Sequence, residues 1–228
     1  MEKIFDQSLV EAHRARALRN ADPKAGFLLD IVAQELAERV SVVERHFDRA
    51  LELHGYTGQT AHHLMATGKV GAVERVETDA RFGSVQAPVT IASLEEVPGE
   101  PEGFNLVVSP LSLHLTNDTP GAFIQVRRAL KPDGLFLAAI PGSGTLQELR
   151  EALLAAEAEL TGGASPRVIP FADVRDVGAL LQRAGFALPV TDVETVTVRY
   201  ATMFDLMADL RAMGAANPLV GRSHRPAR

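Results

Sequence analysis

The chain has 228 residues, a net charge of −6, and neither cysteine nor tryptophan. This length fits one domain with a sizeable core, the acidic balance offers no basic surface for nucleic acid, and the absence of cysteine excludes disulfides, thiolate catalysis and cysteine-bound metals. No apolar run approaches the ~20 residues of a membrane-spanning helix, and the first residues lack the layout of a signal peptide, so we expect a cytoplasmic protein.

The first 45 residues are predicted to form an N-terminal helical arm. Apolar residues with helical spacing predict one helix over residues 8–18 and a second over residues 24–40. The sequence Asn-Ala-Asp-Pro at residues 20–23 ends the first helix and caps the second. The arginines of the first helix are interpreted as a solvated face, with a docking patch as the alternative. They are Arg14, Arg16 and Arg19.

Short apolar runs then alternate with helical stretches over residues 46–141. The runs predict strands at residues 48–53, 72–76, 89–91, 104–109 and 135–140, and the stretches predict helices at residues 59–66 and 119–130. Asn117 and Asp118 are candidate N-caps, and residues 131–134, Lys-Pro-Asp-Gly, have the composition of a turn. Strands separated by helices predict an α/β fold, a mostly parallel sheet with helices on both faces.

Residues 142–228 are predicted to be the substrate-side part of the same single domain. Helical patterns occupy residues 145–160, 173–184 and 202–213, and the first two are separated by a loop suited to a lid. Alternating valine and threonine over residues 188–200 predict a strand with one wet face near the edge of the sheet.

The first predicted strand ends in a pattern that can bind a ligand. Glu52 lies at its carboxyl end, where open α/β sheets place ligands. Gly55 and Gly58 follow and let backbone approach a bound molecule closely. Glu77 ends the second strand, at the position expected for an acid that holds ribose hydroxyls. The sequence therefore predicts a nucleotide-like ligand against this strand, turn and helix N-terminus.

Several stretches resemble one known family. Residues 104–118, FNLVVSPLSLHLTND, are similar to the fourth strand and following loop of the class I S-adenosylmethionine-dependent methyltransferases, and residues 130–136, LKPDGLF, to their turn into the fifth strand. Residues 170–186 and 200–214 extend the similarity over nearly the whole chain. The resemblance implies a Rossmann-like class I methyltransferase sandwich, and the chain stops before the last strand of that sandwich.

Within the family, the chain resembles one branch most. That branch contains the carrier-protein methyltransferase of biotin synthesis and the mitochondrial complex I assembly factors. The assembly factors are the more similar, because residues 142–150 and 203–207 also look like them. One member of the branch is associated with arginine hydroxylation, so the fold does not fix the reaction.

The resemblance implies S-adenosylmethionine as cofactor and assigns residues to it. Glu52, His54, Gly55 and Gly58 would line its methionine end, and Glu77 would hold its ribose. Ser93 and Leu94 would lie near adenine, and residues 109–114 at the reacting end. The implied cofactor-binding set is Glu52, Leu53, His54, Gly55, Gly58, Glu77, Ser93, Leu94 and Ser109.

The candidate catalytic residue is His114, which follows the fourth strand and is expected to face the mouth of the pocket. It would position a substrate or act as a base, and a loop histidine that packs or hydrogen-bonds is the alternative. No metal is expected, because the histidines lack ligand spacing such as His-Glu-x-x-His. The histidines considered are His46, His54, His62 and His63.

The chain departs from the family pattern where the cofactor would touch backbone. His54 and Tyr56 stand where the first two of three alternating glycines belong, and only Gly58 is kept. Ser93 replaces the acid that usually contacts adenine, and Asn105 replaces the usual aspartate of the fourth strand. Tyr56 is expected either to stack on an adenosine or to plug the cleft.

Two functions follow from these observations. The first is a methyltransferase-like protein that acts on a protein subunit of a respiratory complex, by modification or by chaperoning. The alternative is a cofactor-free pseudo-enzyme that serves as an assembly or binding factor. The sequence leaves the oligomeric state and the acceptor atom open.

Overall fold

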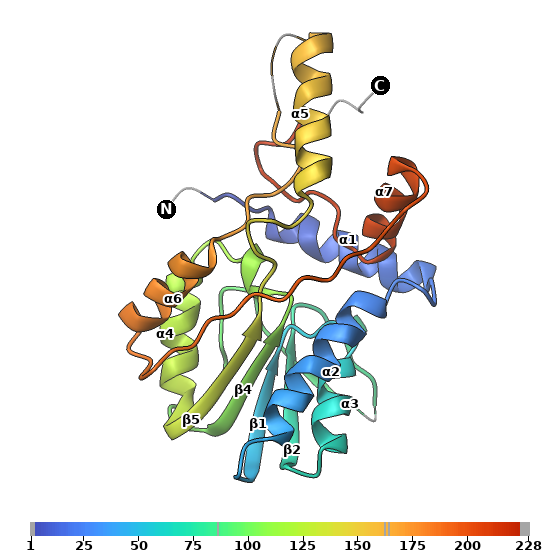
Figure 1. The fold of residues 1–228 in the computed structure, drawn as a ribbon. Coiled ribbons are helices and arrows are strands. Elements are labelled where there is room, and N and C mark those ends of the chain that lie inside the picture. Colours follow the sequence, from blue (N-terminus) through green and yellow to red (C-terminus); the bar gives the residue numbers. More distant parts are fainter. Residues whose placement is uncertain (1–2, 86, 162, 164, 224–228) are drawn as a thin grey trace.

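The computed structural model describes residues 3–85, 87–161, 163 and 165–223. Five parallel strands form one sheet in the order β3-β2-β1-β4-β5, so the first strand lies in the centre (Figure 1). The strands are β1 Phe47–Leu53, β2 Val70–Glu77, β3 Val89–Ile91, β4 Phe104–Pro110 and β5 Leu130–Ala139. This is the α/β class that the sequence predicts.

Helices cover both faces of the sheet. On one face, α2 (Phe27–Ser41) and α3 (Gln59–Ala66) pack against β1 and β4 around fully buried Val40 and Leu64. On the other face, α4 (Thr119–Ala129) packs on β4 and β5, and α6 (Val174–Arg183) packs on α4. Strands covered on both faces read as continuous apolar runs, which explains why β4 is the clearest strand in the sequence.

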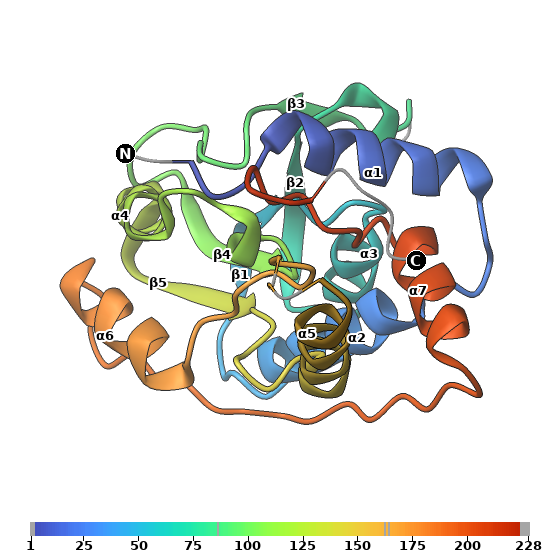
Figure 2. The same cartoon turned by 90° about the horizontal axis from the view of Figure 1, so that it is seen from above.

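The N-terminal helix α1 (Gln7–Asn20) lies above the carboxyl ends of the strands (Figures 1 and 2). Asp6 caps it by accepting the backbone N–H of Leu9. Its buried stripe consists of Val10, Arg14 and Ala17. The interpretation of Arg14 as part of a solvated face is therefore wrong, because α1 turns this arginine toward the sheet.

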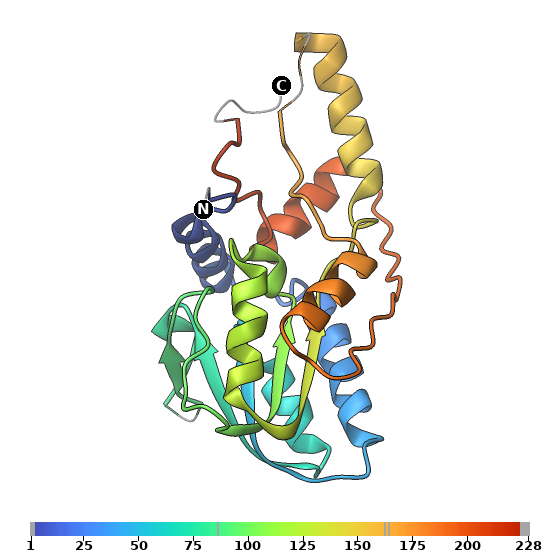
Figure 3. The ribbon, with the colours of Figure 1, turned by 90° about the vertical axis from the view of Figure 1, so that its left-hand side faces the viewer.

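Two further helices complete the structure. In Figure 3, α5 (Gln147–Thr161) projects away from the sheet, and α7 (Met203–Ala212) lies near α1. Thr202 and Asp205 form a reciprocal capping box at the start of α7. The short 3₁₀ turns η1 Ala80–Phe82 and η2 Leu113–Leu115 follow β2 and β4. Among the described residues, no helix is both long and apolar enough to cross a membrane.

Two predicted elements are wrong. The turn predicted at residues 131–134 lies within β5, because Leu130 already pairs with Phe104 and a register shift absorbs the extra residues. The edge strand predicted at residues 188–200 is an extended segment that pairs with none of the described strands. It crosses α2 instead, where Arg39 forms ion pairs with Asp192 and Glu194.

The two candidate caps of α4 have different roles. Asp118 is the N-cap and accepts the backbone N–H of Gly121 at 2.9 Å, as predicted. Asn117 instead accepts the backbone N–H groups of Ile4 and Phe5 at 2.8 and 2.9 Å. The loop after β4 is thereby attached to the N-terminal segment, which carries α1 across the ends of the strands.

Candidate functional site

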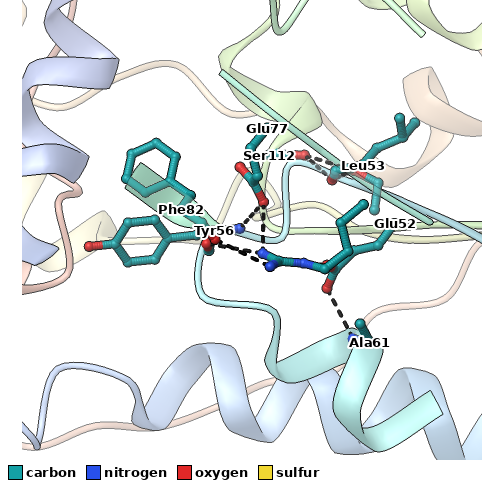
Figure 4. Close-up of polar contacts among 9 residues, drawn as sticks. Glu52, Leu53, Tyr56, Ala61, Glu77, Phe82 and Ser112 are labelled. Carbon is teal, nitrogen blue, oxygen red and sulfur yellow. Dashed lines mark hydrogen bonds and ion pairs between the residues drawn. The ribbon is translucent and has the colours of Figure 1, made fainter. Parts of the chain in front are cut away.

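The candidate site lies where β1 and β2 end at the carboxyl edge of the sheet. Glu52 and Glu77 are both fully buried there, although each carries a carboxyl group. The Glu52 carboxylate accepts the backbone N–H of Ala61, in the first turn of α3, at 3.1 Å. Figure 4 shows the two glutamates on either side of one network of polar contacts.

The centre of this network is Arg75, which sequence reasoning missed. Parallel pairing places Arg75 directly beside Glu52, and its Nε donates to the Glu52 carboxylate at 2.6 Å. Its Nη2 lies 3.4 Å from Glu77 Oε1 and donates to the Tyr56 carbonyl oxygen at 3.2 Å, and its Nη1 donates to the Phe82 carbonyl oxygen at 3.2 Å. An arginine two residues before Glu77 in the same strand was the available signal, since a buried charge requires a partner.

Gly55 and Gly58 make room for this network. A Cβ atom on Gly55 would lie 2.3 Å from Glu52 Oε1, and one on Gly58 would lie 2.8 Å from Arg75 Cζ. Gly58 also has a φ of 78°, a conformation that side chains disfavour. Packing against Glu52 and Arg75 therefore requires these glycines, whether or not a ligand touches the turn.

His54 and Tyr56 keep the backbone shape that glycines usually supply. Their φ angles are 54° and 64°, which costs on the order of 1–2 kcal/mol for each residue with a side chain. The Tyr56 ring makes an edge contact with Phe82 at 5.1 Å, and its hydroxyl donates to the Arg14 carbonyl oxygen at 2.9 Å. The Tyr56 side chain thus attaches the turn to α1.

His54 extends from the turn toward the segment that follows β3. Its ring is almost completely buried and interacts with the backbone of Ser93 and Glu96. Burial and the nearby charge of Arg14 lower the pKa of His54 to about 3, so the ring is neutral at pH 7. Ser93 itself is exposed, whereas Leu94 is buried against α1.

Glu77 keeps one oxygen free in the buried site. Its Oε1 accepts the backbone N–H of Tyr56 at 2.6 Å, whereas its Oε2 is buried and has no hydrogen-bond partner among the described residues. Burial raises the pKa of Glu77 to about 7, although the charge of Arg14 acts in the opposite direction. A buried carboxylate oxygen without a partner is costly and is an acceptor for a ligand hydroxyl.

Other buried polar atoms of the site also lack hydrogen-bond partners in the part of the chain that the structure describes. They are Arg14 Nη1, His54 Nδ1, Thr78 Oγ1 and His114 Nδ1. The positive charge of Arg14 acts on His54, His114 and Glu77, which places these side chains in one electrostatic neighbourhood. A hydroxylated, charged ligand such as a nucleoside joined to an amino acid would supply the missing partners. The residues present therefore fit S-adenosylmethionine chemically, with histidine and arginine side chains in addition to backbone.

The loop after β4 closes the site from the other side. The Ser109 and Ser112 hydroxyls are hydrogen-bonded to each other at 2.7 Å, and both lie within hydrogen-bond distance of the carbonyl oxygen of Leu53 at the end of β1. His114 follows in η2, with its ring centroid 6.2 Å from that of Phe171. The structure thus gathers most of the predicted residues around one place, with Ser93 at its exposed margin.

Replacing His114 with glutamine is expected to make the free energy of unfolding depend less steeply on pH below about pH 6.5. Burial and Arg14 lower the pKa of His114 to about 3, whereas the unfolded chain protonates this ring below about pH 6.5. The unfolded chain then binds more protons, so the free energy of unfolding falls as the pH drops through this range, by ~1.4 kcal/mol per pH unit. Urea unfolding between pH 7 and pH 4 measures the slope.

Glutamine cannot titrate, so the variant should lose this contribution. His46→Gln is the matched control, because it replaces an exposed histidine and should retain the wild-type slope. An unchanged slope in His114→Gln would contradict the enclosed, neutral ring.

Comparisons with known proteins agree with this architecture. Residues 51–138 match a family model described as a methyltransferase domain. In a solved complex of the Haloferax volcanii Trm112 methyltransferase activator with a methyltransferase, a matching chain has a TM-score of 0.55 and 15% identity, with 76% of this chain and 75% of that one covered. Such a likeness shows the fold alone.

Similar sequences carry two kinds of name. "Arginine-hydroxylase NDUFAF5, mitochondrial" of Danio rerio is 37% identical over 94% of this chain and 68% of its own length, and its Mus musculus counterpart is 40% identical over 94% and 64%. "Malonyl-[acyl-carrier protein] O-methyltransferase" of Halorhodospira halophila is 35% identical over 84% and 66%. The chain thus spans about two thirds of the length of these relatives.

Proposed function

The chain belongs to the class I S-adenosylmethionine-dependent methyltransferase family, and from this premise we propose that it binds the cofactor beside Glu77 and acts on a protein subunit, as an assembly factor for respiratory complex I would. The similarity to proteins named NDUFAF5 supports the choice of branch. The cytoplasmic location expected from the sequence stays a prediction.

The observation that carries the cofactor proposal is the free oxygen of Glu77. An acid at the end of the strand beside β1 is well placed to accept both hydroxyls of a ribose. Tyr56 and Arg75 engage only Oε1, so Oε2 remains available inside the site. A purely structural carboxylate would more often have both oxygens satisfied.

The other unpartnered groups suggest how the remainder of the ligand is held. S-adenosylmethionine supplies a methyl group on a positively charged sulfur. Arg14 Nη1 is a donor for an anionic group such as the amino-acid carboxylate. His54 and His114 are neutral and can each donate or accept one hydrogen bond, depending on the tautomer.

His114 fits a positioning role better than that of a base. A ring with a pKa of about 3 binds a proton too weakly to take one from an acceptor at neutral pH. Methyl transfer is a displacement that depends mainly on alignment in a dry pocket. A half-buried, neutral imidazole suits that requirement, since it can orient an acceptor without adding charge.

The alternative, a cofactor-free assembly or binding factor, is supported less well. Its main argument is that His54 and Tyr56 replace two glycines of the family pattern. Both residues nevertheless keep the left-handed backbone of the turn, and the tyrosine ring packs toward α1 and Phe82. Unpartnered atoms of Arg14 and Glu77 would carry an unexplained cost in a protein without a ligand.

The cofactor proposal is tested by titrating S-adenosylmethionine into the chain, with calorimetry and thermal unfolding as readouts. Ligand at 100 times its Kd should stabilise the fold by ~2.7 kcal/mol. Glu77→Gln should weaken binding by roughly 10- to 100-fold, because hydrogen bonds to a charged acceptor contribute about 1.5–3 kcal/mol.

Glu74→Gln is the matched control from the same strand. Glu74 is about half-exposed and pairs with Arg49 outside the site, so its replacement should leave the affinity unchanged. No binding at millimolar ligand would refute the cofactor proposal. Co-purification of a respiratory-complex subunit with the chain would separately test the proposed partner.

A further inference from the structure

A hollow of the molecule lies outside the network of Glu52, Arg75 and Glu77. It has a volume of about 960 Å³ and lies between the N-terminal segment, the start of α5, residues 166–171 and residues 219–221. Phe5 and Leu219 form an isolated antiparallel bridge beside it, which joins the two terminal segments. We call this hollow the terminal groove. Its volume is that of a site for a ligand of substantial size.

The charge of the terminal groove opposes that of the whole chain. Of the described residues that line it, two are basic, Lys3 and Arg150, and none is acidic, although the chain has a net charge of −6. Among the described residues, no carboxylate pairs with either cation. Arg150 donates to the carbonyl oxygen of Thr145 at 3.1 Å, and this contact leaves its positive charge uncompensated.

The remaining walls are mostly apolar and lead toward the candidate site. Val168, Ile169 and Leu219 line the groove together with Phe171. Arg150 lies over the Phe171 ring at 5.9 Å, and the His114 ring lies 6.2 Å from that same ring. A molecule in the groove would therefore be one aromatic ring away from His114.

From this combination we infer that the terminal groove binds an apolar chain that carries a carboxylate. Uncompensated cations attract an anionic group, and the apolar walls bury the chain. A guanidinium or ammonium group would be repelled by Lys3 and Arg150. If the cofactor binds beside Glu77 as proposed, a ligand in the terminal groove would be the molecule that accepts the methyl group. Only this role as acceptor rests on the proposed function.

The test uses three probes that differ only in their head group: octanoate, octanol and octylamine. Calorimetry on the full chain should show octanoate binding more tightly than octanol, and octylamine binding least. Lys3→Glu should weaken octanoate binding about fivefold, in line with ~1 kcal/mol for an accessible ion pair. Phe171→Ala should weaken octanoate and octanol alike, because it removes an apolar wall.

Lys24→Glu is the matched control, since it makes the same charge change at an exposed lysine outside the groove. Octylamine binding as tightly as octanoate would overturn the inference, as would octanoate binding that Lys3→Glu and Lys24→Glu affect equally. Absence of octanoate binding at millimolar concentration would also overturn it. S-adenosylmethionine is titrated into the same variants in a separate experiment. If the cofactor proposal is wrong, this titration shows no binding, whatever the octanoate titration shows.

Discussion

Arg75→Met is expected to destabilise the folded chain by about 3–5 kcal/mol at neutral pH, because it leaves buried carboxylates without their cation. Arg75 donates to Glu52 at 2.6 Å and also lies beside Glu77, and all three side chains are buried. Burial raises the pKa of both glutamates. The folded variant would then hold two neighbouring acids in a site that disfavours their charge.

The pH dependence of this loss has a definite sign. An acid with a raised pKa in the folded state is protonated there while the unfolded chain has already released its proton. Stability is therefore lost as the pH rises toward the folded pKa, and the cost of Arg75→Met should be smaller at pH 5 than at pH 8. Urea unfolding at both pH values measures the difference.

The chain contains its own control for this prediction. Arg49 and Glu74 form another arginine–glutamate pair between β1 and β2, at 2.6 Å, but both side chains are about half-exposed. Arg49→Met should cost no more than about 1 kcal/mol, because water screens exposed ion pairs. Equal costs for the two variants would show that Arg75 is not the centre of a buried network.

Gly58→Ala is expected to cost about 2–5 kcal/mol, the second large effect. The new Cβ atom would lie 2.8 Å from Arg75 Cζ, in a residue whose φ is 78°. The left-handed backbone contributes about 1–2 kcal/mol, and crowding of a packed interior adds about 1–3 kcal/mol. Chemical unfolding of the variant measures the sum.

Gly68→Ala separates the two contributions. Gly68 has a φ of 68°, and a Cβ atom there would meet nothing within 4 Å. Its replacement should therefore cost only the backbone part, about 1–2 kcal/mol. If Gly58→Ala proved no worse than Gly68→Ala, the turn would not be held against Arg75 as described.

Most of the fold follows from the sequence because its signals are local. The β4 strand is an apolar run between a glycine and a proline, and the N-caps Asp118 and Thr202 set the starts of α4 and α7. The segment at residues 188–200 has an equally strong local pattern, yet it forms no strand. A strand forms only where a neighbouring strand pairs with it, and the sequence of the segment alone does not show whether such a neighbour exists.

The site was predictable only in part, for the same reason. Glu52 and Glu77 could be placed because each ends a predicted strand. The role of Arg75 depends on the register between two strands, and that of Arg14 on which face of α1 turns inward. Both are tertiary facts. Gly55 and Gly58 also gained a second explanation, since Glu52 and Arg75 occupy the space beside them.

The central claim is that a nucleoside cofactor supplies the missing hydrogen-bond partners of the unpartnered polar atoms in the site of Glu77. Side-chain ¹⁵N NMR tests it directly, because the chain has only seven histidines and two of them border the site. His54→Gln and His114→Gln assign the two signals. Addition of S-adenosylmethionine should shift both signals and leave those of exposed His46 and His62 in place. Unchanged His54 and His114 signals at millimolar ligand, or shifts confined to the exposed histidines, would contradict the claim.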